Sequence, residues 1–323
     1  MKNNKEIGGY LELERYSGSL YHDEAVPLNC GRGCLSYLIE LRDIKEIWLP
    51  DYLCESVEEQ CAVDQVNVKR YAVNRSFQPN WETITADEGF LYLVDYFGLL
   101  REETIDYALE LFSDRLIVDE TQGFFRLPRP QVDTLYTTRK YFGVPDGGFV
   151  YVDRLLERRL EKDESRTRMN YLLGRFERTA SEFFSEAQEN NEAVSVGYAR
   201  EMSLITKNLL RSLDYDGIIA RRESNYRFLE RYLSQHNSLE IEMPIGPFAY
   251  PFLVKDGPSA RALMAAQKIY IPTLWPNVVV DLEVGEIAKE YATNILPLPV
   301  DQRYDKEDMR LIVDTMFAEG IIR

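Results

Sequence analysis

The chain has 323 residues, which is enough for one large hydrophobic core and a second, smaller one. A hydrophobic content of 45% with 12% aromatic residues is typical of a folded globular protein and excludes a disordered one. The net charge of −16 argues against general nucleic-acid binding, which requires a basic surface.

The sequence also argues against a membrane protein, a secreted protein and a metal site. No apolar run approaches the roughly 18 residues of a membrane span, and the polar start lacks the apolar segment of a secretory signal. We therefore expect a cytoplasmic protein whose four cysteines, all in the first fifth of the chain, are reduced. The histidines are His22 and His236, so neither a zinc site nor a His-based triad is expected, and His22 is expected to be a loop residue.

An arm over residues 1–25 precedes a long region in which strands and helices alternate. Helices are expected over 34–42, 52–63 and 102–112, and strands over 44–49, 65–71, 89–95, 116–118, 133–137 and 148–152. Alternation at such short intervals predicts an α/β fold with a mostly parallel, doubly wound sheet.

Beyond residue 153 the pattern changes to helices and then to a mixed α+β region. Helices are expected over 155–162, 167–188, 204–233, 258–267 and 305–318, and strands over 239–243, 250–254 and 269–271. The predicted domains are a large one over 26–235, which includes interface helices, and a smaller C-terminal one over 236–323.

One lysine, Lys140, stands between hydroxyl residues and a turn rich in Gly and Pro, within residues 136–148. Taken alone, this pattern is more often a surface lysine in a loop. A lysine in a partly desolvated pocket, however, loses its proton readily enough to bind the aldehyde of pyridoxal phosphate (PLP). We interpret Lys140 in this way because a matching carboxylate lies upstream.

That carboxylate is Asp119, which ends a short apolar strand. Functional side chains collect at the C-terminal ends of parallel strands, so Asp119 is a candidate partner for the pyridine nitrogen of PLP. An equally good alternative is a helix N-cap after the strand. Gln122, three residues on, is placed to reach the phenolic oxygen of the ring.

A phosphate cup is expected where Gly31, Arg32 and Gly33 lead into the first helix. A loop of small residues that enters a helix exposes backbone N–H groups to an anion. By itself, Gly-x-Gly before a helix is also common in ordinary turns.

Five stretches that follow one another along the chain carry a family resemblance. They run from Asn29 to Leu35, Trp48 to Cys54, Val94 to Gly98, Asp119 to Gln122, and Arg139 to Gly148. The series resembles the DegT/StrS-type sugar aminotransferases, which have the type I PLP-dependent transferase fold. The resemblance covers about residues 8–275. It implies that the chain is a divergent and short member of the family.

The resemblance implies how the cofactor would be held. Lys140 would bind PLP covalently, Asp119 would pair with the pyridine nitrogen, and Gln122 would contact the phenolic oxygen. The backbone at the turn of Arg32 would hold the phosphate, together with a hydroxyl from Thr137 or from the threonine after it.

The family also places an aromatic residue or a histidine on the face of the cofactor ring. Cys54 aligns with that position, and a thiol cannot stack on a ring. We therefore expect Tyr52, Tyr96 or Phe97 to supply the ring contact.

Later residues are candidates for the phosphate and substrate contacts. The segment 197–203 resembles a family segment that lies at the dimer interface and reaches the cofactor phosphate of the neighbouring subunit. Ala199 falls where a phosphate-binding Asn is expected, so Arg200 is the candidate for that contact, with a helix-face salt bridge as the alternative. Tyr250 and Trp275 are candidates for lining the substrate site, with a place in the core as the alternative for Trp275.

The resemblance therefore implies a homodimeric PLP-dependent aminotransferase with its active site at the subunit interface. It would transfer the amino group of an amino acid, expected to be glutamate, to a keto sugar, expected to be nucleotide-linked, in surface-polysaccharide or secondary-metabolite biosynthesis. The alternative is a catalytically silent PLP-fold protein with a binding or regulatory role in the same pathway, because Cys54 and Ala199 depart from the family pattern. A dehydratase is disfavoured, because dehydratases of the family commonly lack the lysine found here at position 140.

Overall fold

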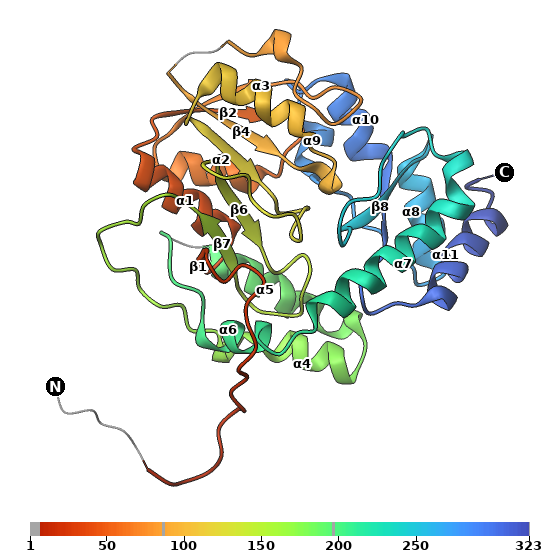
Figure 1. Cartoon of the computed structure of the whole chain (residues 1–323). Helices are drawn as coiled ribbons and strands as arrows, with labels where there is room; N and C mark the ends of the chain where they lie inside the picture. The colour runs from red at the N-terminus through yellow and green to blue at the C-terminus, as the bar shows by residue number, and fades with distance from the viewer. Residues whose placement is uncertain (1–6, 86–87, 196–197, 323) are drawn as a thin grey trace.

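A sheet of seven strands organises the computed structural model, which describes residues 7–85, 88–195 and 198–322 (Figure 1). The strands are β1 (Val26–Leu28), β2 (Glu46–Pro50), β3 (Asn67–Tyr71), β4 (Phe90–Val94), β5 (Leu116–Asp119), β6 (Asp133–Thr137) and β7 (Gly148–Tyr151). Their order is β1-β7-β6-β5-β4-β2-β3, in which β2 to β6 are parallel and β7 and β1 are antiparallel to their neighbours. The predicted mostly parallel α/β sheet is confirmed.

Three of the helices that pack on this sheet are α1 (Gly31–Arg42), α2 (Glu55–Val63) and α3 (Glu102–Phe112). Strand β5 is buried at every residue, as expected for a strand that is covered on both faces. Helix α3 buries Ile105, Ala108 and Phe112, whose spacing of three and four residues forms one helix face. The bounds of α3 are those predicted from the sequence.

The helices after the sheet are α4 (Asn170–Glu177), α5 (Phe184–Ser195), α6 (Leu204–Leu210) and α7 (Tyr215–Leu233). The helix expected over 167–188 is therefore divided between α4 and α5. The helix expected over 204–233 is interrupted before α7, where Asp214 accepts a hydrogen bond from the Gly217 N–H at 3.0 Å and so begins a new helix.

The helix expected over 155–162 is wrong. Its charged side chains are exposed but do not lie on a helix, and one of them, Arg158, donates to Glu40 of α1 at 2.5 Å. The backbone at Lys162 forms an isolated bridge with Glu201. This charged segment is therefore held by contacts with other parts of the chain and not by helical hydrogen bonds of its own.

The C-terminal lobe, from α7 to residue 322, contains a core of its own. Its further elements are β8 (Ala249–Leu253), α8 (Gly257–Ala266), α9 (Pro276–Val280), α10 (Glu286–Asn294), β9 (Ile295–Pro299) and α11 (Lys306–Ala318). Strands β8 and β9 pair in an antiparallel sheet, and α7 and α11 pack together beside them. The helices expected over 258–267 and 305–318 are confirmed.

The strands expected over 239–243 and 269–271 are wrong. The side-chain oxygen of Asn237 accepts hydrogen bonds from the N–H groups of Leu239 and Leu253, so it occupies the edge of β8 where a neighbouring strand would pair. The Ile269 N–H instead closes the end of α8 by donating to Met264 at 3.0 Å.

Arg222 on α7 joins the lobe to the rest of the molecule. Its buried guanidinium donates to the carbonyl oxygens of Tyr141 at 3.2 Å and Pro247 at 2.9 Å, and to the side chain of Gln302 at 2.9 Å. Tyr141 directly follows Lys140, whereas Pro247 and Gln302 belong to the lobe. Gln302 also donates to the Tyr141 carbonyl oxygen at 2.7 Å, so the arginine and this glutamine together fix the lysine segment to the lobe.

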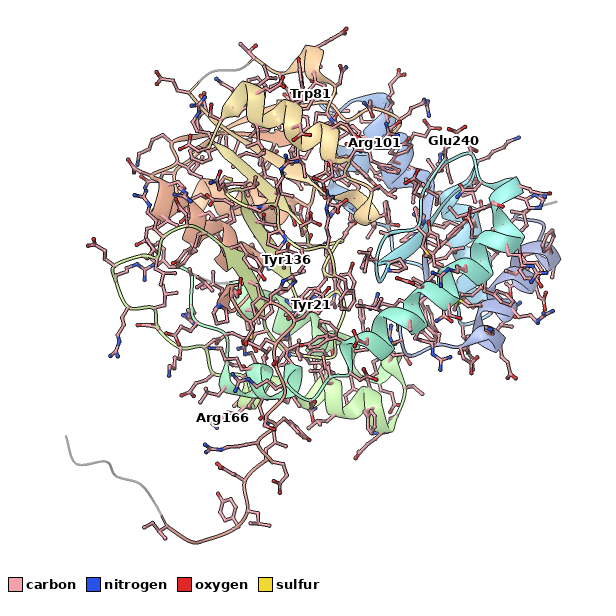
Figure 2. The ribbon with its side chains drawn as sticks, viewed as in Figure 1. Tyr21, Trp81, Arg101, Tyr136, Arg166 and Glu240 are labelled. Atoms are coloured by element: carbon pink, nitrogen blue, oxygen red, sulfur yellow. The ribbon has the colours of Figure 1, made fainter. Side chains whose placement is uncertain are left out.

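A third buried cluster, rich in aromatic residues, lies beside the lysine segment. It contains Tyr136 at its centre, with Tyr21 packed against it, and both are labelled near the middle of the molecule in Figure 2. Residues 7–19 extend from this region away from the body, while residues 1–6 of the expected arm lie outside the described ranges (Figure 1). None of the helices within the described ranges is long and apolar enough to cross a membrane.

Candidate active site

Lys140 lies in a tight loop between β6 and β7. The Thr138 hydroxyl donates to the carbonyl oxygens of Asp146 at 3.0 Å and Gly147 at 3.1 Å, which closes the loop at its base. Gly147 has a φ of +123°, and a Cβ there would collide with the Thr138 hydroxyl, so glycine is required. The loop therefore holds Lys140 on a short and well-supported segment.

The surroundings of the Lys140 ammonium, here termed the recess, include Thr121 and Phe248. The Lys140 Nζ donates to the hydroxyl of Thr121 at 3.1 Å and lies 5.8 Å from the ring centre of Phe248. The residue keeps exposed surface, yet protein atoms crowd its ammonium, and the resulting loss of hydration lowers the pKa of Lys140. The nearby Asp119 and Cys54 oppose this shift without reversing it. A lowered pKa gives the neutral amine that attacks a carbonyl carbon.

Asp119 stands at the C-terminal end of β5 and is buried. One carboxylate oxygen accepts from the hydroxyl of Tyr92 at 2.7 Å and the other from the N–H of Thr121 at 2.8 Å. Thr121 thus contacts both groups, because its hydroxyl accepts from Lys140. The structure brings Asp119 and Lys140 to the same edge of the sheet, one residue apart through Thr121.

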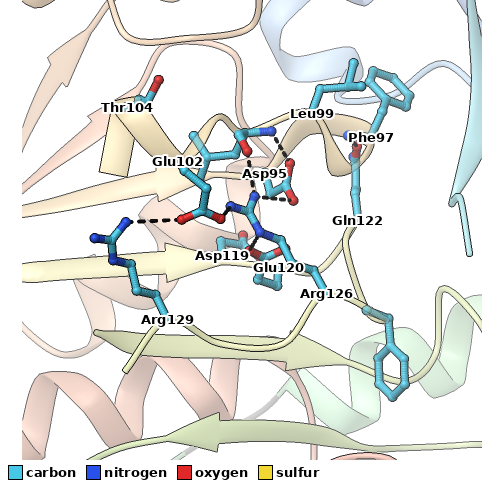
Figure 3. A network of polar contacts seen from close by, with 12 residues as sticks. Asp95, Phe97, Leu99, Glu102, Thr104, Asp119, Glu120, Gln122, Arg126 and Arg129 are labelled. Carbon is cyan, nitrogen blue, oxygen red and sulfur yellow. Dashed lines mark hydrogen bonds and ion pairs between the residues drawn. The ribbon is translucent and has the colours of Figure 1, made fainter. Parts of the chain in front are cut away.

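Gln122 is buried beside this pair, and only one end of its side-chain amide has a hydrogen-bond partner among the described residues. Its side-chain oxygen accepts from the N–H of Phe97 at 2.8 Å, in a turn where Phe97 has a φ of 58° (Figure 3). Its Nε2 is buried and has no hydrogen-bond partner among the described residues. Buried donors are normally satisfied, so Nε2 fits an acceptor that belongs to a ligand.

The N-terminus of α1 lies beside the lysine loop. A Cβ on Gly148, in the strand that follows the loop, would collide with the Cys34 side chain and the Cys30 backbone, and the carbonyl oxygen of Asn29 accepts from the Gly147 N–H at 2.5 Å. The sulfur of Cys30 caps the helix by accepting from the Gly33 N–H at 3.3 Å.

Two guanidinium groups flank this helix start. Arg32 donates to the backbone carbonyl oxygen of Asn191 at 3.2 Å, and Arg139 donates to the side chain of the same residue. Burial raises the pKa of the Cys30 thiol, and the positive charges of both arginines oppose the rise, which places them close to the helix start. Thr137 lies beside the same loop, and its hydroxyl donates to the Gly147 carbonyl oxygen at 3.3 Å.

The candidates for the ring face lie in different surroundings. Tyr52 and Tyr96 stack on each other with 5.2 Å between ring centres and are closed off by Trp275, 4.5 Å from Tyr52. All three belong to the large core, so the alternative interpretation of Trp275 as a core residue describes its position. Cys54 is half-buried directly before α2 and lies near enough to Lys140 to affect its pKa.

The substrate candidates are also separated. Tyr250 is fully buried in the core of the C-terminal lobe, 4.9 Å from the ring of Tyr226, and does not face the recess. Arg200 lies beside the helix start: its backbone exchanges hydrogen bonds with Asn29, and its guanidinium has no hydrogen bond or ion pair within the described ranges. Residue 197 of the expected interface segment lies outside those ranges.

Sequence reasoning missed three contributors to the recess. Thr121 lies inside the motif from Asp119 to Gln122, so its hydroxyl could have been included from its position alone. Arg139 directly precedes Lys140, inside one of the stretches that carry the resemblance, so its charge could have been considered for the phosphate. Phe248 reaches Lys140 from the C-terminal lobe, and no local pattern announces a contact between such distant segments.

The sheet order and this recess define an α/β protein of the type I PLP-dependent transferase fold. No family model and no curated protein matches the sequence. Solved structures do match along most of the chain. The sugar aminotransferase CalS13 from Micromonospora echinospora is 13% identical with a TM-score of 0.65, and the match covers 92% of this chain and 87% of that one.

Two further structures show the same likeness. DesV from S. venezuelae, in complex with a ketimine intermediate, is 15% identical with a TM-score of 0.66 over 93% of this chain and 85% of its own. The E. coli GDP-4-keto-6-deoxy-D-mannose-3-dehydratase with bound hydrated PLP is 12% identical with a TM-score of 0.62. The match covers 90% of this chain and 87% of the dehydratase. The chain therefore has the fold of the DegT/StrS-type sugar aminotransferases.

Proposed function

We propose that this protein is a PLP-dependent aminotransferase that acts on a keto sugar. The observation that carries the proposal is the recess itself: Lys140, with a lowered pKa, is joined through Thr121 to the buried carboxylate of Asp119. These are the amine and the acid that the aldehyde and the pyridine nitrogen of PLP require.

The residues around the recess fit the parts of PLP. The unsatisfied Nε2 of Gln122 suits the phenolic oxygen, and the carboxylate of Asp119 suits a protonated pyridine nitrogen. The start of α1, with Arg32 and Arg139 beside it, suits a dianionic phosphate, because helix N-termini and guanidinium groups both bind phosphate oxygens. When bound, PLP would withdraw electrons from the substrate carbon next to the amine.

Lys140 would have two roles in the reaction. Its neutral amine would bind the aldehyde carbon of the cofactor at rest, since its low hydration favours the uncharged form. Displaced by an amino acid, the same amine would take the proton from the donor's α-carbon as a general base and then, as an acid, deliver it to the former aldehyde carbon. The Thr121 hydroxyl would orient Nζ, and the anionic Asp119 would hold the proton on the pyridine nitrogen.

The substrates we propose are glutamate as amino donor and a nucleotide-linked keto sugar as acceptor, in surface-polysaccharide or secondary-metabolite biosynthesis. The names of CalS13 and of the E. coli dehydratase, a sugar and a GDP-sugar enzyme, support a sugar as acceptor. An anionic substrate must overcome the net charge of −16, and we propose that Arg200, whose backbone is bonded to Asn29 beside the start of α1, supplies local positive charge.

We also propose that the protein is a homodimer and that a second copy completes the site. Helices α4 and α5 expose Leu173, Phe176 and Phe184, at 59%, 93% and 62% of their surface, and such a patch suits an interface. Helix α5 also carries the residue that binds Arg32 and Arg139. Sedimentation at several concentrations would measure the assembly, and a monomer throughout would contradict it.

The cofactor is tested by loading the purified protein with PLP, reducing with sodium borohydride and digesting with trypsin. Mass spectrometry should then find the cofactor on Lys140, and Lys140→Ala should carry none. Absence of any PLP adduct from the wild-type protein would overturn the proposal.

The reaction is tested by adding glutamate to the loaded protein and following the visible absorbance of bound PLP. Loss of that absorbance with formation of pyridoxamine phosphate supports the aminotransferase. A loaded protein that keeps its absorbance with every amino acid would instead support the silent binding protein.

A further inference from the structure

Two buried carboxyl groups lie directly behind the recess. Asp95 follows β4 and Glu120 follows β5, so the two neighbouring parallel strands present them side by side (Figure 3). Asp95 is 0% exposed and Glu120 is 2% exposed. Neither residue was singled out by the sequence patterns, and neither has a role in the proposed reaction.

The packing around Gly123 shows how closely the two groups approach. A Cβ on Gly123 would collide both with Oε2 of Glu120 and with Oδ2 of Asp95, so the two oxygens face the same point on the backbone. Oε2 of Glu120 is buried and has no hydrogen-bond partner among the described residues, although Oδ2 of Asp95 is its neighbour at Gly123. A proton on Oε2 would let this oxygen donate a hydrogen bond to Asp95, whereas two ionised carboxylates cannot bond to each other.

The surrounding charges cannot neutralise both groups as anions. Arg126 approaches Asp95 at 3.4 Å and Glu120 at 3.7 Å, but it also pairs with Glu102 and donates to the Leu100 carbonyl oxygen at 2.6 Å. Asp95 receives a second donor, the Leu100 N–H at 2.6 Å, whereas Glu120 receives none from the described residues. Asp95 is therefore the better anion, and Glu120 is the better place for the proton.

The pair lies between the two segments that hold Gln122. The segment that begins at Asp95 supplies the Phe97 N–H that binds the Gln122 side chain. The Gly123 N–H donates to the backbone oxygen of Glu120 at 3.0 Å, which closes the turn that contains Gln122. The separation between the two carboxyl groups therefore sets the position of Gln122.

We propose that Asp95 and Glu120 share one proton and that this proton holds Gln122 in position for the cofactor, so that PLP affinity falls when the proton is lost. The inference rests on the proposed function, because it assigns Gln122 to PLP. Asp95 and Glu120 are positioning residues, since they act through Gln122 and Gly123 and do not reach the recess themselves.

The direction of the pH effect follows from the geometry. Loss of the proton leaves two adjacent anions that face one shared arginine, and their repulsion pushes on Gly123, which has no free space. Burial raises the pKa of both groups, and the neighbouring Asp95 raises that of Glu120 further, so the loss occurs above the usual carboxyl range. The other titratable groups that face the pair are Arg126, Glu102, Asp119, Tyr136 and Tyr141.

The test compares the wild-type protein with Glu120→Gln, in which an amide replaces the protonated carboxyl group. The dissociation constant of PLP is measured by absorbance at pH 6.5 and pH 9. We expect the wild-type affinity to fall at least about tenfold more than that of Glu120→Gln over this interval, since about 1.4 kcal/mol corresponds to tenfold. Asp95→Asn, which removes the same repulsion from the other side, should resemble Glu120→Gln.

Glu102→Gln is the matched control, because Glu102 pairs with the same arginine but lies at the surface, outside the carboxyl pair. It should keep the wild-type pH dependence. Equal pH dependence in the wild type, Glu120→Gln and Asp95→Asn would overturn the inference.

A second measurement separates this inference from the proposed function. The midpoint of urea unfolding of the protein without PLP should decrease from pH 6.5 to pH 9 in the wild type and much less in Glu120→Gln, because the native state binds the shared proton more tightly than the unfolded chain. If no variant binds PLP but this difference is found, the proton sharing holds and the proposed cofactor is wrong. If PLP binds and the difference is absent, the proton sharing is wrong.

Discussion

His22 gives a prediction about acid stability. Its side chain is fully buried before β1, with 4.0 Å between its ring centre and that of Tyr136. Its Nε2 lies 2.8 Å from the carbonyl oxygen of Phe124 and so carries the proton, while Nδ1 accepts from the hydroxyl of Tyr151 at 3.2 Å. Burial lowers the pKa of His22 from 6.5 to about 4, so the native protein contains a neutral imidazole.

The sign of the effect follows from proton binding. As the pH falls below 6.5, the unfolded chain takes up a proton at His22, whereas the native protein does so only near pH 4. The contribution of His22 to stability is therefore complete above pH 6.5 and is lost as the pH falls from 6.5 to about 4. The loss is about 2 kcal/mol of unfolding free energy at pH 5 and about 3 kcal/mol over the whole interval.

The assay is urea unfolding followed by tryptophan fluorescence at pH 7.5 and pH 5, which gives the change in unfolding free energy between the two. His22→Gln keeps a donor for the Phe124 carbonyl oxygen but does not titrate, so its change should be smaller than that of the wild type by about 2 kcal/mol. His236→Gln, which removes the other histidine from a partly exposed turn, should keep the wild-type change. A His22→Gln variant that loses as much stability as the wild type would refute the reasoning.

Two substitutions test other contacts of the lysine segment. Arg222→Met leaves the carbonyl oxygen of Pro247 without its donor, while that of Tyr141 keeps Gln302, and should lower the unfolding free energy by about 2 kcal/mol in urea. The exposed neighbour Arg221→Met should change it by less than about 0.5 kcal/mol, and equal effects would contradict the role of Arg222. Arg139→Gln should weaken PLP binding about tenfold but leave the binding of pyridoxal, which lacks the phosphate, unchanged. The same loss for both ligands in titrations would show that Arg139 does not bind the phosphate.

The sheet and the motif around Asp119 were predictable because their signals are local. Buried parallel strands are continuous apolar runs, and α3 repeats its apolar residues with the helical period. The carboxyl ends of such strands meet at one edge, so a strand that ends in Asp119 and a loop that holds Lys140 were expected to be neighbours.

The errors came from segments whose conformation depends on distant partners. The residues over 239–243 alternate like a strand, but the side chain of Asn237 takes the pairing position on β8. Within 155–162, Arg158 is bound by Glu40, and the backbone of Lys162 pairs with that of Glu201. The approach of Phe248 to Lys140 likewise depends on how the lobe docks, which no local pattern encodes.

The contacts by which Arg222 joins the lysine segment to the C-terminal lobe, termed the joint, affect how the sequence of such a protein can change during evolution. Two of the three acceptors of Arg222 are main-chain oxygens, at positions 141 and 247, and every amino acid carries such an oxygen. Mutations at those two positions can therefore accumulate without breaking the joint, whereas a mutation at position 222 removes it. A few anchors of this kind allow a protein to keep its fold while most of its sequence changes.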